Sequence, residues 1–187
     1  MKRKILCIFL VLFSLNSFSQ ESKATKKKVS AQRQTLISYA LAHQGKPFVM
    51  GAVGPNSFDC SGFVGYVMNY GLGVQLPRTA QAIYNSKKVK IISSKEKEPG
   101  DLVFFKDTKI NPNKFTHVGI YCGIYHNSKN PNTRFEGKRV FISAISDGPR
   151  TGVQLELMDA RYWKNHLYAY GRVLPKTEEY NSSLKKK

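Results

Sequence analysis

The chain contains a cysteine and a histidine, Cys60 and His117, whose surroundings suit nucleophilic chemistry. Cys60 follows a glycine-rich loop and begins a segment in which apolar residues recur at helical spacing. The N-terminus of a helix carries about half a positive charge. This field favours the thiolate, the reactive form of cysteine, and can lower the pKa of the thiol. Backbone N–H groups at the same helix start could stabilise an oxyanion. We therefore interpret Cys60 as the candidate nucleophile, against the alternative of a small buried core residue.

His117 is the histidine best placed to serve as the base for this nucleophile. It lies early in a strand-like run, residues 115–121, and a rigid strand can hold an imidazole in position. His43 and His166 lie near the ends of predicted helices, where a cation suits the helix dipole. His126 precedes a polar loop. We interpret these three histidines as structural or solvated.

Beyond residue 19 the chain has two cysteines, Cys60 and Cys122. In an oxidising compartment one interpretation is a disulfide between them. Strand alternation places Cys122 with Val118 on the face opposite His117. If His117 faces Cys60, Cys122 faces away as a core residue, and a disulfide is disfavoured unless a β-bulge changes the frame.

The hydrophobic pattern predicts helices first and strands afterwards. Helical spacing begins at Ser30, a possible cap, and ends near Gly45. Asp59 is a suitable N-cap for a helix that starts near Cys60 and that Gly71 would end. A short helix is expected after Thr79 and another over 159–164, with strands over 101–105, 115–125, 139–146, 152–157 and 167–174. This order indicates an α+β domain with helices packed on an antiparallel sheet.

The first nineteen residues differ from the rest of the chain. Residues 2–4 are basic, residues 5–13 are mostly apolar, and residues 17–19 include the small side chains that a signal peptidase selects. The apolar run is shorter than the roughly 20 residues of a membrane span. We predict a signal peptide over residues 1–19, with an uncleaved anchor as the alternative. The protein is then exported, periplasmic or extracellular, and has no integral membrane segment after cleavage.

The rest of the chain is expected to hold a flexible basic lead-in at 20–30, one catalytic domain at 31–174 and a polar basic tail at 175–187. Removing residues 1–19 lowers the net charge from +18 to +15. Such a charge suits polyanions, and export favours wall polymers over nucleic acid, so we expect no nucleic-acid partner. The cysteines and histidines lack metal-ligand spacing. We therefore expect no metal site and no cofactor.

Five segments of the chain resemble, in the right order, the motifs of the NlpC-type peptidoglycan endopeptidases, which are papain-like cysteine peptidases. They are 45–51 (GKPFVMG), 58–64 (FDCSGFV), 76–80 (LPRTA), 99–105 (PGDLVFF) and 117–121 (HVGIY). The resemblance is weaker from there to about residue 174. Five ordered motifs are far more specific than one.

The resemblance implies a papain-like α+β fold with the nucleophile at a helix N-terminus. It also implies hydrolysis of a peptidoglycan stem peptide, typically between D-glutamate and the following diamino acid. Cys60 is then the nucleophile that forms a thioester, and His117 the general base. Asp59 and Ser61 resemble the residues that hold the substrate's free amine. The implied partner is the peptidoglycan stem peptide.

The chain departs from the family pattern in three places. Ser143, in the segment 141–144, replaces a third polar residue that is most often histidine; its hydroxyl can accept a hydrogen bond from the imidazole. Asp147 is a weaker candidate for that role. Phe48 replaces a tyrosine whose hydroxyl contacts the substrate amine. Residues 127–138 lengthen the loop after the base strand, and such insertions often reshape a cleft.

Three functions fit these residues. The first is an active wall endopeptidase, from the pairing of Cys60 with His117. The second is a wall-binding protein that keeps the fold without turnover, for which Ser143 and Phe48 are the motivation. The third is a related acyl-transfer amidase with a different substrate, for which the inserted loop is the motivation.

Overall fold

A computed structural model describes residues 29–106, 114–127, 133–148 and 151–173. The predicted signal peptide and the basic tail lie outside these ranges, as does most of the lead-in. The chain divides into two compact units, Met1–Gln34 and Thr35–Lys187. Residues 29–34 of the first unit are helical, so Ser30 lies within a helix and its prediction as a cap is wrong. In the described ranges, no helix has the length and apolarity that crossing a membrane requires.

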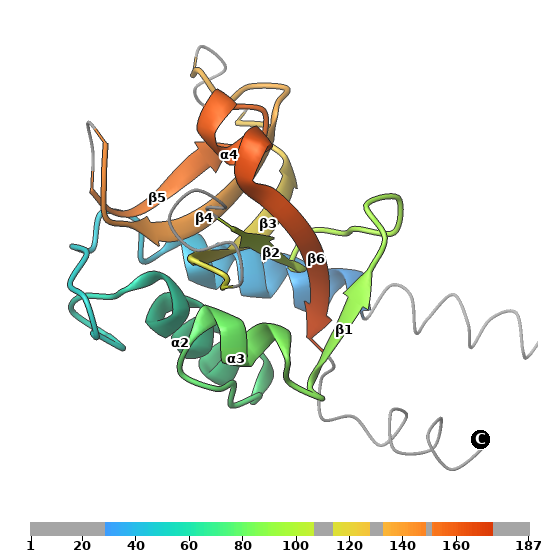
Figure 1. Cartoon of the computed structure of the whole chain (residues 1–187). Helices are drawn as coiled ribbons and strands as arrows, with labels where there is room; N and C mark the ends of the chain where they lie inside the picture. Colours follow the sequence, from blue (N-terminus) through green and yellow to red (C-terminus); the bar gives the residue numbers. More distant parts are fainter. Residues whose placement is uncertain (1–28, 107–113, 128–132, 149–150, 174–187) are drawn as a thin grey trace, which may run out of the picture. The chain divides into compact units, whose positions relative to one another are not determined.

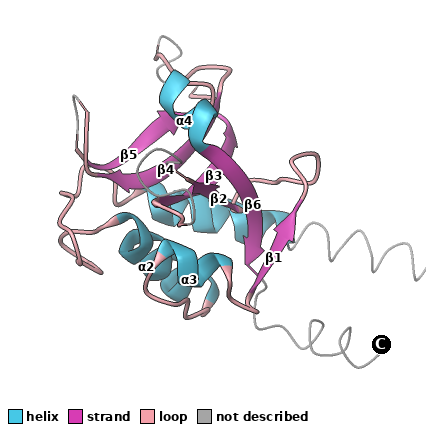
Figure 2. Cartoon of the chain, viewed as in Figure 1, coloured by secondary structure: helices cyan, strands magenta, loops and turns pink. Residues whose placement is uncertain are grey.

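The second unit begins with helical residues 35–41 and continues as an α+β domain, coloured by secondary structure in Figure 2. Its elements are α2 (Cys60–Leu72), α3 (Ala80–Tyr84), β1 (Val89–Ile92), β2 (Leu102–Phe105), β3 (His117–Ile124), β4 (Arg139–Ile145), β5 (Gly152–Leu157), α4 (Arg161–His166) and β6 (Leu167–Val173). The predicted order of helices before strands is confirmed, with α4 as the expected late helix.

Six strands form one antiparallel sheet in the order β1-β6-β2-β3-β4-β5 (Figure 1). Strand β1 was not predicted. It has four residues, two of them exposed, and pairs with β6 from the far end of the chain. Its sequence shows no strand alternation. Its extended conformation depends instead on pairing with β6.

The two faces of the sheet have separate apolar clusters. On one face α2 packs against β3 and β4, with Phe63 in the same cluster as Val118 of β3. On the other face Phe105 and Phe141 pack with Trp163 of α4. Because neighbouring residues of a strand point to opposite faces, β3 contributes to both clusters. Its first residue, His117, contacts Phe105 of one cluster and directly precedes Val118 of the other.

Helix α2 begins as predicted and ends later than predicted. Asp59 is its N-cap and accepts the N–H of Gly62. Gly71 lies inside the helix, and Gly73, with a φ of 67°, is the C-cap. The prediction that Gly71 ends the helix is therefore wrong. A Cβ on Gly71 would stand 2.5 Å from Leu36 Cδ1, so this glycine permits close helix packing.

An ion pair between a buried carboxylate and a partly exposed arginine joins the start of β2 to β6. Asp101 is 1% exposed, and its two oxygens accept hydrogen bonds from Arg172 Nε at 2.9 Å and Nη2 at 2.8 Å. It also accepts the N–H of Glu98 at 2.7 Å. These contacts hold the turn before β2 against the last strand.

We expect Asp101→Ala to lower the free energy of unfolding by about 3 kcal/mol, because it removes a buried carboxylate that accepts hydrogen bonds from Arg172 and from the N–H of Glu98. Urea denaturation followed by circular dichroism measures the change. Asp159→Ala is the matched control: Asp159 pairs with Arg139 at 2.8 Å on the surface, where an ion pair contributes roughly 0–1 kcal/mol. Equal losses in the two variants would contradict the assignment.

Candidate active site

Cys60 is the first residue of α2, and its thiol is partly buried. The backbone N–H groups of Val118, Ser61 and Cys60 itself point at the sulfur. Val118 directly follows His117, so the sulfur lies beside the peptide unit that joins these two residues. The structure therefore brings the tip of α2 to the start of β3. The N–H groups of Cys60 and Ser61 are also placed to stabilise an oxyanion that forms next to the sulfur.

Burial raises the pKa of the Cys60 thiol above its ordinary value, and the negative charge of Asp59 raises it further. The N–H groups that point at the sulfur act in the opposite direction and have the smaller net effect. The expectation that the helix start lowers the pKa of this thiol is therefore wrong for the free protein. A thiolate in these surroundings loses more hydration than the N–H dipoles replace.

His117 lies half-buried at the start of β3, among aromatic side chains. The centroid of its ring is 5.0 Å from that of Trp163 and 5.9 Å from that of Phe105. Its Nε2 atom is buried and has no hydrogen-bond partner among the described residues. Burial lowers the pKa of His117 to about 4, against the opposing effect of Asp59. The imidazole is therefore neutral at pH 7, as a general base must be.

The Cys60 side chain packs against the apolar cluster of α2 and the His117 ring contacts Trp163 of the other cluster, while the N–H of Val118, the residue after His117, points at the sulfur. Cys122 packs against the cluster that contains α2 and Val118, while the His117 ring contacts Trp163 in the other cluster. Cys122 is confirmed as a core residue, and burial raises its pKa to about 12. That His117 faces Cys60 stays a prediction. Cys60 and Cys122 nevertheless have free thiols.

Ser143 lies on β4 and is fully buried. Its hydroxyl donates a hydrogen bond to the carbonyl oxygen of Val118 at 2.7 Å. This contact fixes the residue whose N–H points at Cys60, and it does not reach the Nε2 atom of His117. Asp147 lies in the exposed segment after β4 and accepts a hydrogen bond from Ser146 at 2.9 Å. A third catalytic role for Ser143 stays a prediction.

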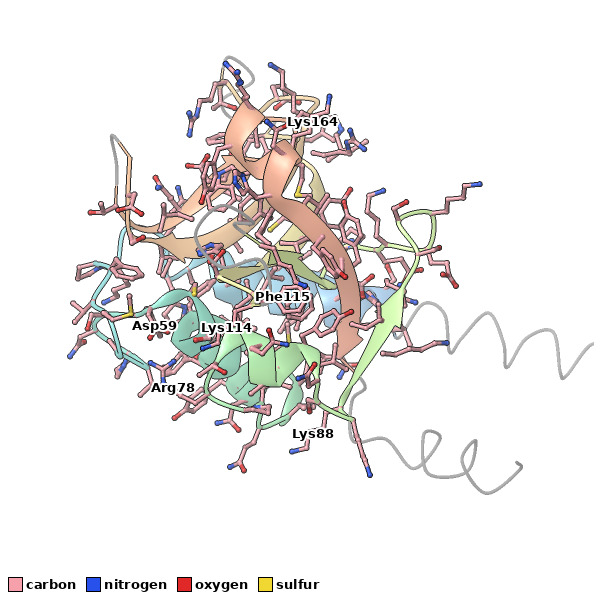
Figure 3. All side chains as sticks on the ribbon, in the orientation of Figure 1. Asp59, Arg78, Lys88, Lys114, Phe115 and Lys164 are labelled. Carbon is pink, nitrogen blue, oxygen red and sulfur yellow. The ribbon has the colours of Figure 1, made fainter. Side chains whose placement is uncertain are left out.

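Asp59 organises the surroundings of the nucleophile. One oxygen accepts the N–H of Gly62 at 2.7 Å, and the other accepts the N–H of Gly51 at 2.9 Å. The Arg78 guanidinium forms an ion pair with both oxygens (Figure 3). Burial disfavours ionisation of Asp59, but these hydrogen bonds outweigh it and hold its pKa below the ordinary value. Sequence analysis missed this role of Arg78, whose only signal was its place in the segment 76–80.

The other predicted substrate residues are also in contact with the protein. Ser61 donates to Asp59 at 3.2 Å and accepts from Arg78 at 3.0 Å. Phe48 is half-buried and forms a backbone bridge with Phe58. Because Asp59 and Ser61 already have partners, a substrate amine must share or displace them. Binding of an amine by Asp59, Ser61 and Phe48 stays a prediction.

Trp163 is the second residue that sequence analysis missed. It is 8% exposed and packs against His117, so it holds the imidazole ring on one side. The available signal was that it is the one tryptophan in the chain. The described part of the chain contains no group of three or more His, Cys, Asp or Glu side chains that could hold a metal ion.

A sequence profile described as the NlpC/P60 family matches residues 45–172, a range that includes α2, β1 to β5 and β6 up to its last residue but one. The chain belongs to the NlpC/P60 family. The resemblance inferred from the five motifs is thereby confirmed, and with it the papain-like α+β fold. A crystal structure described as similar to a lipoprotein of the NLP/P60 family, from Staphylococcus aureus, has 33% sequence identity and a TM-score of 0.58. The match covers 77% of this chain and 42% of that one.

Curated relatives in the NlpC/P60 family are named as wall endopeptidases. The bifunctional muramidase/DL-endopeptidase CwlT of Bacillus subtilis is 36% identical over 141 residues, which cover 75% of this chain and 36% of CwlT. The murein DD-endopeptidase MepH of Escherichia coli is 32% identical over 158 residues, which cover 82% of this chain and 51% of MepH. This chain thus spans between a third and about half of the length of these two relatives.

We expect alkylation of Cys60 by iodoacetamide to be slow at pH 6 and to rise about tenfold per pH unit up to pH 9. A raised pKa leaves only a small fraction of thiolate below that pH. Mass spectrometry of the native protein after timed exposure measures the rate at Cys60, with buried Cys122 as the internal control. Fast alkylation of Cys60 at pH 6 would instead indicate a thiolate–imidazolium pair in the free protein.

Proposed function

We propose that this NlpC/P60 chain is a peptidoglycan endopeptidase in which Cys60 is the nucleophile and His117 the general base. The observation that carries the proposal is the sulfur of Cys60 beside the N–H of Val118, directly next to the imidazole-bearing residue. The names of CwlT and MepH support peptidoglycan as the substrate. We assign the cut to the bond between D-glutamate and the following diamino acid, as the DL-endopeptidase name of CwlT favours.

In the first half of the reaction, His117 accepts the thiol proton while the sulfur attacks the carbonyl carbon of the scissile bond. The N–H groups of Cys60 and Ser61 bind the oxyanion of the tetrahedral intermediate. The carbon–nitrogen bond then breaks, and His117 returns the proton to the leaving amine. A thioester on Cys60 remains.

In the second half, water attacks the thioester carbon. His117 removes a proton from this water, and the carbon–sulfur bond breaks to release a free carboxyl group. The sulfur takes the proton back as the thiol. A neutral imidazole with a pKa of about 4 is available for each proton transfer at neutral pH.

A second candidate function is wall binding without turnover. It is favoured by the buried Nε2 atom of His117, which no described residue orients by a hydrogen bond. Ring packing against Trp163 and Phe105 holds the imidazole, with no hydrogen bond from a described residue at Nε2. Substrate binding then persists, while the proton transfers are slow. Turnover on purified peptidoglycan separates the two functions.

We expect the mature protein to release soluble peptide fragments from purified peptidoglycan, and Cys60→Ala to lower the release at least about a thousandfold, since no nucleophile remains. Liquid chromatography with mass spectrometry measures the fragments and identifies the bond that was cut. Cys122→Ala is the matched control and keeps release within about threefold. Equal release by wild type and Cys60→Ala refutes the proposal, and sedimentation with peptidoglycan without release favours the binding function.

We also propose that the protein is exported and acts outside the cytoplasm, since peptidoglycan lies there. The predicted signal peptide over residues 1–19 supports this and lies outside the described residues. Expression of the full chain in a bacterium is expected to yield a mature protein that begins within two residues of Gln20. Intact-mass analysis of the exported protein measures this start. A mature chain that still carries residues 2–4 contradicts the cleavage.

A further inference from the structure

A cavity of about 480 Å³ lies beside His117, with walls that come from β3, β4, β5 and α4. Its lining includes His117, Ile145, Asp147, Glu156, Tyr162 and Trp163. The aromatic part belongs to the sheet face that carries Trp163, opposite the face on which α2 packs. A cavity of this volume is large enough for an amino-acid side chain.

The cavity adjoins His117, the residue that gives its proton to the leaving amine in the proposed mechanism. In the proposed mechanism the acyl group of the substrate is transferred to the sulfur of Cys60, while His117 hands its proton to the departing nitrogen. That nitrogen must therefore be within hydrogen-bond reach of the imidazole when the bond breaks. The residue attached to it extends from the imidazole into the cavity that His117 lines.

The chemistry of the cavity favours a cation. Of the described residues that line it, Asp147 and Glu156 are acidic and none is lysine or arginine, in a chain with a net charge of +18. Glu156 has an ion-pair distance of 3.7 Å to Arg134, which is long enough to leave it able to bind a second cation. The rings of Tyr162 and Trp163, with centroids 4.9 Å apart, add aromatic surface that attracts an ammonium group.

We propose that this cavity binds the residue on the leaving side of the cut and that Asp147 and Glu156 select a free side-chain amine on it. The inference rests on the proposed function and concerns its specificity. A stem peptide whose side-chain amine is free carries the cation. A stem peptide cross-linked through that amine carries a neutral amide, which these carboxylates do not attract. The enzyme therefore prefers stem peptides that are not cross-linked.

Three synthetic stem peptides that differ only in the residue after the cut test the proposal: L-lysine, Nε-acetyl-lysine and norleucine. Wild-type mature protein is expected to cleave the lysine peptide with a kcat/KM about tenfold above the other two, mainly through KM, because a hydrogen bond to a charged group contributes this much. The double variant Asp147→Asn, Glu156→Gln is expected to cleave all three within about twofold of one another.

Glu136→Gln is the control, since Glu136 is an acidic residue that pairs with His126 and does not line the cavity. It should keep the tenfold preference. Equal cleavage of the three peptides by wild type overturns the specificity while leaving the proposed function intact. A double variant that loses activity on all three alike overturns it too, since the carboxylates are then structural. If wild type cleaves neither these peptides nor peptidoglycan, the proposed function fails and the specificity fails with it.

Discussion

The carboxylate of Asp59 is the interaction on which the rest of the site depends. It caps α2 through Gly62, holds the preceding loop through Gly51 and pairs with Arg78 after the helix. One buried side chain thereby joins three segments of the chain around Cys60. A buried carboxylate persists only when hydrogen bonds replace its lost hydration, and here they do. Loss of any one partner therefore disturbs the place where the nucleophile begins the helix.

Desolvation determines the charge state of the reacting groups. It raises the pKa of the Cys60 thiol and lowers the pKa of the His117 imidazole, so both groups are neutral in the free protein. The negative charge of Asp59 raises the pKa of the Cys60 thiol further, because it disfavours a second negative charge nearby. In the proposed mechanism the proton then moves only as the sulfur attacks, and the separated charges form at a site where backbone N–H groups already point at the sulfur.

The two faces of the antiparallel sheet support different residues of the site. α2 delivers the sulfur from one face, and the aromatic cluster with Trp163 holds the imidazole from the other. The start of β3 is the place where both can meet, because adjacent residues of a strand point to opposite sides. In the proposed mechanism and specificity, the two halves of a substrate have separate surroundings: helix N–H groups for the acyl half, and an acidic and aromatic cavity for the amine half.

Local chemistry in the sequence determined the order of helices and strands, the cap at Asp59, the start of α2 at Cys60 and the family of the chain. These features depend on residue types at fixed spacings, which the sequence displays directly. Gly71 was misjudged because a glycine that ends a helix and one that admits a neighbouring side chain have the same signature.

Only the tertiary structure decided the existence of β1, the partner of Asp59, the face on which His117 lies and the direction of the Cys60 pKa shift. Strand β1 depends on pairing with β6, and Arg78 depends on a return of the chain to the start of α2. The Cys60 thiol is likewise desolvated by atoms from distant segments of the chain, so no local sequence pattern predicts the direction of its pKa shift. Pairing and burial join residues that are far apart in the chain, which is why the sequence alone left them open.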